Sequence, residues 1–475
     1  FFESLPKGAD LHTHLAGAVY AETFIREAAE DNLCVNTKTL TLYKPAGTTR
    51  SLPPQPVCGD EGEPAASSLS HQKLYDQLLD RFSMRTFVPV TGESGHDHFF
   101  ASFEEFQAVE NPGHVGEWVD ELATRAAEQN EQYLEIMHTP TFAPVLALAE
   151  NLGPVDMETD FAHLRQQLLD AGLQKYLPAM QAEFEEGERN RREREHCRTS
   201  QATPACKVEV RFLYQVLRAL PSPAVFIQLV CGFELASKNS LVVGINMVQP
   251  EDWRVPLANY RIQMQMVHAL HLLYPEVHIT LHAGELSPGM TSPKDLRFHI
   301  RSAVEVANAE RIGHGVDVMQ EDRPYDLLKE MAAKRIMTEI NLTSNDVILN
   351  VKDADHPLPL YRLYHVPVAL STDDEGVSRI NLTHEYVRAA ISYPLTYSDF
   401  KNMVRTSLEH SFLPGQSLWE QSGSWENFAH VRTACREQLG REQATGACAA
   451  LLEGSAKASQ QFELERRFHA FESSF

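Results

Sequence analysis

Short runs of apolar and β-branched residues recur along the chain, and most are followed by a stretch whose apolar positions have helical spacing. Such alternation predicts βα units and a parallel sheet. The predicted strands are Ala9–His14, Tyr133–His138, Val208–Tyr214, Leu241–Met247, Val277–His282, Arg311–His314, Ile336–Asn341 and Val366–Thr372. The predicted helices include Val115–Asn130, Phe161–Gln181, Ala224–Ser237, Asn259–Leu273 and Leu296–Asn308. Eight strands in this order favour a closed (β/α)8 TIM barrel, in a single domain over residues 1–475.

Three segments do not fit the bare barrel. Residues 34–95 begin with a Pro-, Gly- and Ser-rich stretch, which is typical of a long insertion after the first strand. The charge run Glu183–Glu195 predicts a solvated helix end. The sequence after about residue 400 is helical in pattern, and we expect these additional C-terminal helices to cover the bottom or flank of the barrel.

The composition narrows the choice of partners. A net charge of −23 disfavours nucleic acid, because a phosphate backbone is bound through clustered Lys and Arg. No run approaches the ~18 apolar residues of a membrane span, so we expect no membrane partner. A small-molecule substrate remains, and homodimerisation is left open.

Seven cysteines carry information about the compartment. Six lie in sequence-near pairs, and there is no C-x-x-C motif, which disfavours a thiolate zinc site. The pairs permit three disulfides in an exported protein, and free thiols are the alternative. Cys231 lies in the apolar stretch Ala224–Leu235 and is expected in the core. Because the chain starts Phe1-Phe2, we expect that a segment such as a secretory signal precedes it.

Polar residues gather where four of the predicted strands end. In a barrel of this type the functional side chains lie at the carboxyl ends of the strands. His12 and His14 are two apart on a strand, so both can face the barrel mouth. The remaining strand-end residues are His282, Glu285, His314, Asp373 and Asp374.

This set of imidazoles and carboxylates predicts a catalytic zinc site. The best four-ligand set is His12, His14, His282 and Asp373. Glu285 and His314 are then titratable groups beside the metal, as expected of a general acid/base pair. Each element alone has a structural alternative, since an Asp-Asp pair is most often a helix cap. Placement at four strand ends favours the metal site. We assign the histidines outside this pattern to the surface or core: His96, His98, His268, His271, His278 and His299.

The motifs "LPKGADLHTHLAGA", "LHAGE", "RIGHG" and "LSTDDEG" resemble the adenosine deaminase family of metal-dependent hydrolases. The long insertion and the cysteines look like the extracellular branch, the adenosine-deaminase-related growth factors, and a bacterial periplasmic relative fits equally well. This resemblance implies a periplasmic or secreted protein, with the cytoplasm left open. The expected cysteine pairs, which rest on spacing and export, are Cys34–Cys58, Cys197–Cys206 and Cys435–Cys448, with Cys231 free.

The resemblance also implies roles for the site residues. One Zn²⁺ per chain would be held by the four ligands named above. Glu285 would donate a proton to the purine ring, and His314 would accept one from the attacking water. Asp374 would hydrogen-bond the five-membered half of the purine. The implied reaction is hydrolytic deamination of adenosine, or a close purine nucleoside, to inosine and ammonia.

Two positions depart from the family pattern. The family's classical branch carries an acidic residue that binds the ribose 5′-hydroxyl where this chain has Ala16. The family also tends to have a Gly after the fourth strand, where this chain has Gln249. Gly17 and Gln249 are therefore candidate substrate contacts, and looser demands at the 5′ position are expected.

Two alternatives stay open at this stage. One is a deaminase of another aminopurine, such as adenine, an N6- or 5′-modified adenosine, or AMP. The other is an adenosine-binding signalling protein whose catalysis is incidental. The zinc deaminases of the cytidine type are excluded, because their H-x-E and P-C-x-x-C signatures are absent.

Overall fold

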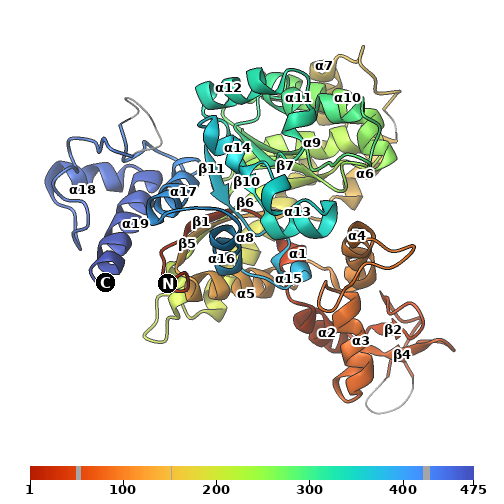
Figure 1. Ribbon diagram of the computed structural model, residues 1–475. Helices are drawn as coiled ribbons and strands as arrows, with labels where there is room; N and C mark the ends of the chain where they lie inside the picture. Colours follow the sequence, from red (N-terminus) through yellow and green to blue (C-terminus); the bar gives the residue numbers. More distant parts are fainter. Residues whose placement is uncertain (50–54, 151, 421–427) are drawn as a thin grey trace.

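A computed structural model describes residues 1–49, 55–150, 152–420 and 428–475. Its centre is an eight-stranded parallel sheet in the order β1-β5-β6-β7-β8-β9-β10-β11, surrounded by helices (Figure 1). The strands are β1 Gly8–His14, β5 Glu131–His138, β6 Glu209–Leu217, β7 Val242–Val248, β8 His278–Ala283, β9 Arg311–His314, β10 Met337–Ile340 and β11 Val368–Leu370. The (β/α)8 barrel predicted from the sequence is confirmed, and each strand lies within a few residues of its expected range.

The barrel closes where its last strand meets its first. The backbone N–H of His14 donates to the carbonyl of Asp373 at 3.1 Å, and the N–H of Asp373 donates to the carbonyl of His12 at 2.8 Å. A parallel bridge joins Thr13 to Asp373 at the same place. The residues that complete the barrel are therefore candidate metal ligands or their direct neighbours.

Helices cover the outside of the barrel, and most follow the strand order. They include α5 Val115–Glu128, α9 Ser222–Ala236, α10 Arg254–His271, α11 His299–Glu305, α12 Pro324–Lys334, α13 Leu342–Leu349, α14 Leu358–Leu363, α15 Glu375–Ser378, α16 Leu382–Ser392 and α17 Tyr397–Glu409. The prediction of one helix over 161–181 is wrong. Helix α7 (Phe161–Asp170) ends before Gly172, whose φ of 94° is left-handed, and α8 (Leu177–Arg194) starts anew.

The charge run in α8 is only partly solvated, which corrects the expectation of a solvated helix end. Arg191 is fully buried and pairs with Glu188 at 2.6 Å and with Glu195 at 2.8 Å. A β-carbon on Gly187 would lie 2.6 Å from Val115, so α8 crosses close to α5. The charged residues of this run pair with one another along α8, so the sequence predicted a surface that faces water. One side of the run instead packs against another helix, and its charges are paired there.

The insertion after β1 forms a small substructure of its own. Helix α2 (Ala21–Glu30) leads into a three-stranded antiparallel sheet of β2 Cys34–Asn36, β3 Leu42–Tyr43 and β4 Gly62–Pro64, followed by α3 Gln72–Arg81 and α4 Gly95–Phe106. The sheet and α3 project to one side of the barrel (Figure 1). Helix α4 returns to pack against α13, which follows β10 at the mouth of the barrel.

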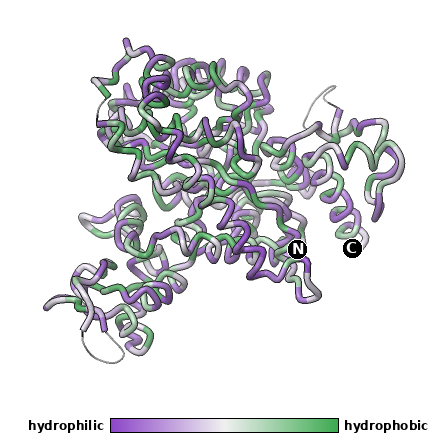
Figure 2. The backbone as a smooth tube through the Cα atoms, turned by 180° about the vertical axis from the view of Figure 1, so that it is seen from behind, coloured by the Kyte–Doolittle hydropathy of each residue, from purple (hydrophilic) through white to green (hydrophobic). Residues whose placement is uncertain are grey.

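The C-terminal segment lies on the opposite side from the insertion (Figures 1 and 2). Helices α18 (Gly446–Glu453) and α19 (Ala456–Glu472) enclose a second apolar cluster that includes Trp419 and Phe462. Helix α17 joins this cluster to the barrel, because α19 packs against it. These are the additional C-terminal helices predicted from the sequence. Among the described residues, no helix is both long enough and apolar enough to span a membrane.

Candidate metal centre and active site

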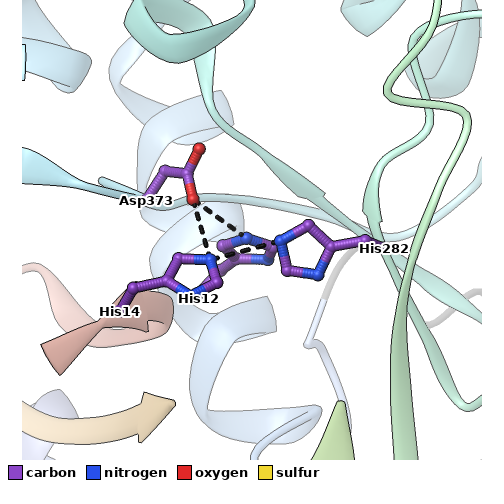
Figure 3. A group of neighbouring side chains, drawn as sticks. All are labelled: His12, His14, His282 and Asp373. Carbon is purple, nitrogen blue, oxygen red and sulfur yellow. Dashed lines mark hydrogen bonds and ion pairs between the residues drawn. The ribbon is translucent and has the colours of Figure 1, made fainter. Parts of the chain in front are cut away.

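Four side chains from three separate places in the barrel wall meet at its carboxyl end (Figure 3). The Nε2 atoms of His12 and His14 lie 3.3 and 3.2 Å from Oδ1 of Asp373. The Nε2 atom of His14 lies 3.2 Å from that of His282. The structure thus brings together the four residues that the sequence predicted as ligands.

Each of the three imidazoles uses its other nitrogen to contact an acceptor. Nδ1 of His12 lies 2.6 Å from Oε2 of Glu339. Nδ1 of His14 lies 2.7 Å from Oε1 of Gln215, and Nδ1 of His282 lies 2.9 Å from Oδ1 of Asn246. Because these three partners accept, Nδ1 carries the hydrogen in each ring. In the neutral rings Nε2 then has a free lone pair.

With all three rings neutral, three lone pairs and a carboxylate oxygen point at one another, and a cation between them would stabilise this arrangement. A tetrahedral zinc ion with ligand distances of 2.0–2.1 Å would hold its ligands about 3.3 Å apart. The separations of 3.2 and 3.3 Å in this cluster agree with that value. Nitrogen ligands with one carboxylate suit zinc better than the oxygen shells of calcium or magnesium.

The electrostatics of the cluster also favour a cation. Burial acts to lower the pKa of His12, but Asp373 and Glu339 outweigh it and raise that pKa to about 10. Burial acts to raise the pKa of Asp373, yet hydrogen bonds from His12 and His14 hold that pKa well below its usual range. Asp373 therefore stays charged beside the imidazoles, where its carboxylate could pair with a metal ion.

The ligands rest on a layer of charges inside the barrel. Arg311 on β9 lies 2.7 Å from Glu135 on β5 and 2.7 Å from Glu339 on β10, and all three side chains are fully buried. Glu339 in turn holds His12. Arg311 lowers the pKa of Glu339 against the effect of burial, so this carboxylate stays charged where it orients the ligand.

Glu285 lies beside the ligands, after the end of β8. Its backbone N–H donates to Glu251 at 2.9 Å, and that of Gly284 donates to the same carboxylate at 3.1 Å, which fixes the loop. Burial, with the charge of Asp373, raises the pKa of Glu285 well above its usual value. Glu285 can therefore keep a proton at neutral pH, as a general acid must.

His314 at the end of β9 is fully buried between Glu285 and Asp373. Its Nδ1 lies 3.7 Å from Glu285, and its Nε2 lies 3.9 Å from Asp373. Burial lowers the pKa of His314 to about 3, so the ring is neutral at physiological pH. His314 and Asp373 both have left-handed backbones, with φ of 68° and 61°. Such strained conformations cluster at functional sites.

Asp374 and Gly17 touch each other at the rim of the ligand cluster. Oδ1 of Asp374 is buried and has no hydrogen-bond partner within the described part of the chain. Burial raises the pKa of Asp374 to about 7. A β-carbon on Gly17, in α1 (Leu15–Ala18), would lie only 1.6 Å from Oδ1 of Asp374. Asp374 can therefore take this position only because Gly17 has no side chain.

Gln249 uses its side chain within the barrel wall. Its Oε1 accepts from the N–H of Ala219 at 2.9 Å, and its backbone φ of 86° is left-handed. Its role as a substrate contact stays a prediction, as does that of Gly17. Ala16 is half-buried in the first helical turn after β1.

Sequence reasoning missed the residues that position the ligands and Glu285, directly or through a neighbour: Gln215, Asn246, Glu251, Arg311 and Glu339. One signal was present, because Glu339 and Asn246 interrupt otherwise apolar strands. A polar side chain in the middle of a buried strand needs a partner. Which partner each one takes depends on barrel register, which the pattern does not contain.

Part of the chain is similar in sequence to known proteins. Residues 193–419 match the family model for adenosine deaminase. A curated adenosine deaminase of Clostridium perfringens is 36% identical over 135 residues, which are 28% of this chain and 37% of that protein. The chain thus spans little more than a third of the length of that relative.

Solved structures share the fold. The Arabidopsis N6-mAMP deaminase is 20% identical, with a TM-score of 0.53 over 86% of this chain and 94% of that one. An amidohydrolase from Burkholderia ambifaria, solved with bound Zn, is 16% identical, with a TM-score of 0.53 over 87% of both chains. This chain therefore shares the barrel fold of these two proteins. The likeness in sequence to the adenosine deaminase family covers residues 193–419.

Proposed function

We propose that this chain is a zinc-dependent hydrolase that deaminates adenosine or a close purine nucleoside to inosine and ammonia. The observation that carries the proposal is the convergence of three imidazole lone pairs and Asp373 directly beside Glu285 and His314. His12, His14, His282 and Asp373 would hold one zinc ion. Zinc in such a site supplies Lewis-acid chemistry that makes water a nucleophile at neutral pH.

The chain's own residues account for the proton and the base. Burial raises the pKa of Glu285 well above its usual value, which favours the protonated form that can donate to the ring nitrogen next to C6 as water adds there. Asp374, whose pKa is near 7 and whose Oδ1 is unpartnered, can pair with a nitrogen of the five-membered ring. Loss of ammonia then gives inosine, and the atoms of adenosine and water balance.

The sugar end should be recognised loosely. Ala16 offers no group to the 5′-hydroxyl, so no buried partner is left unpaired when that hydroxyl is missing. The net charge of −23 slows the approach of an anionic nucleotide. An uncharged nucleoside is therefore the proposed substrate.

The test is a panel of adenosine, 5′-deoxyadenosine, adenine and AMP with the zinc-loaded protein, followed by ammonia release. We expect kcat/KM for 5′-deoxyadenosine to stay within about 100-fold of that for adenosine, and AMP to be slower. Tight binding of adenosine without ammonia release would favour the signalling alternative. Preference for AMP or adenine would overturn the proposed substrate and keep the reaction class.

A further inference from the structure

A chain of buried hydrogen bonds runs behind His314, away from the metal ligands. Nδ1 of His314 lies 3.0 Å from Nδ2 of Asn345 and 3.4 Å from Nδ2 of Asn341. Oδ1 of Asn345 lies 3.0 Å from Nε2 of His356. Nδ1 of His356 lies 3.1 Å from the backbone nitrogen of Leu358, at the start of α14. All these polar groups are buried.

The backbone at Leu358 sets the direction of every bond in this chain. A backbone N–H can only donate, so Nδ1 of His356 accepts. Burial lowers the pKa of His356 to about 3, so its ring is neutral and the single ring hydrogen lies on Nε2. That hydrogen is donated to Oδ1 of Asn345, which turns the NH2 group of Asn345 toward His314.

We infer that His356 and Asn345 are positioning residues that fix the tautomer of His314. Two amide NH2 groups, of Asn345 and Asn341, face Nδ1 of His314, so this nitrogen accepts and Nε2 carries the hydrogen. Nε2 of His314 is buried, has no hydrogen-bond partner among the described residues, and lies on the side of Asp373.

This tautomer changes the role of His314. The resemblance implied that His314 accepts a proton from the attacking water, but a neutral imidazole with its hydrogen on Nε2 presents a donor there. His314 would then orient the attacking oxygen by donating to it, and would stabilise the negative charge that develops on it. The role in catalysis rests on the proposed function, whereas the tautomer itself does not.

Three variants test this chain of hydrogen bonds from His356 through Asn345 to His314, called the relay below. Asn345→Asp keeps the shape but replaces the NH2 group by an acceptor, so the hydrogen of His314 should move to Nδ1. His356→Leu removes the donor to Asn345 and should mix the two tautomers. His356→Gln is the matched control, because its NH2 group lies near the place of Nε2 and can still donate to Oδ1 of Asn345.

The readout is ¹⁵N NMR of histidine-labelled, zinc-loaded protein, with the His314 signals assigned by their loss in His314→Gln. We expect wild type and His356→Gln to show the hydrogen on Nε2, and Asn345→Asp to show it on Nδ1. A hydrogen on Nδ1 of His314 in the wild type would overturn the inference. Spectra of Asn345→Asp identical to those of the wild type would overturn it as well. The first result needs no variant, so the test holds even if a variant folds poorly.

Kinetics give a second, independent readout on the same proteins. Loss of one preorganised donor typically lowers kcat by about 10²–10³-fold. We expect a fall of that order in Asn345→Asp, with a nearly unchanged KM, an altered pH profile and full zinc content, and near-wild-type turnover in His356→Gln. If no purine is deaminated but the tautomer is as inferred, the proposed function fails and the relay stands.

Discussion

At the scale of single residues, the position of the Asp374 side chain depends directly on the glycine at position 17. Asp374 occupies the space that a side chain at position 17 would need. The sequence motif places both residues at the barrel mouth, but their contact appears only in three dimensions. A residue without a side chain can thus be a binding determinant through what it leaves free.

We predict that Gly17→Ala weakens substrate binding and spares the metal. The new methyl group would lie 1.6 Å from Oδ1 of Asp374 and displace it. Loss of one hydrogen bond from a charged group corresponds to a rise in KM of about 10–100-fold. Zinc content should not change, because Asp374 is not in the ligand set. Gly47→Ala is the matched control, because a β-carbon there would meet nothing within 4 Å. Equal KM values for the two variants would contradict this contact.

We predict that Glu285→Gln lowers turnover by about 10²–10⁴-fold with zinc retained, since the amide keeps the shape and cannot give up a proton. Burial raises the pKa of Glu285 in the folded protein, so its protonated form persists to higher pH than that of a free carboxyl group. Activity should therefore fall as pH rises through that raised pKa, and this limb should be missing from the residual activity of the variant. Loss of zinc in Glu285→Gln, measured by elemental analysis, would mean that Glu285 is a ligand.

At the scale of elements, the strands could be predicted well and the connections between them less so. Strands β5 and β9 end at His138 and His314, the same residues at which the predicted strands end. The break at Gly172 was not predicted, because the apolar spacing continues across it into α8. Gln215 was missed for a different reason, since its partner His14 lies two strands away in the barrel wall.

We predict that Gln215→Leu weakens zinc binding by about 10–100-fold. Gln215 accepts from Nδ1 of His14 and so keeps its Nε2 free for the metal. Leucine has a similar volume and cannot accept that hydrogen. Gln249→Leu is the matched control, because the side chain of Gln249 binds the backbone of Ala219 and no ligand. Competition with a zinc chelator measures both affinities, and equal values would contradict a role for Gln215.

At the scale of the whole molecule, the three disulfides lie in segments outside the barrel strands. The Cys34–Cys58 disulfide lies in the inserted sheet, and the Cys197–Cys206 disulfide lies in the turn after α8. The Cys435–Cys448 disulfide lies in the C-terminal apolar cluster. The pairing expected from the sequence is confirmed, and Cys231 is free and buried in the core. Because disulfides persist in oxidising compartments, we propose that the protein works in the periplasm or outside the cell.

We predict one alkylatable thiol per chain in the denatured, non-reduced protein, and seven after reduction. The single site should map to Cys231, whose burial raises its pKa to about 12 and protects it in the folded state. Mass spectrometry counts the labels directly. Seven labels without reduction would contradict the disulfides and, with them, the proposed compartment.

The closure of the barrel at Asp373 has a consequence for how the molecule comes apart. The seam between β1 and β11 is held by only a few backbone bonds, and His12, His14 and Asp373 sit on both sides of it. A zinc ion bound there would join the first strand to the last across this seam. Release of the metal would then loosen the amino-terminal strand first, and opening of the seam would release the metal, so demetallation and local unfolding become a single event.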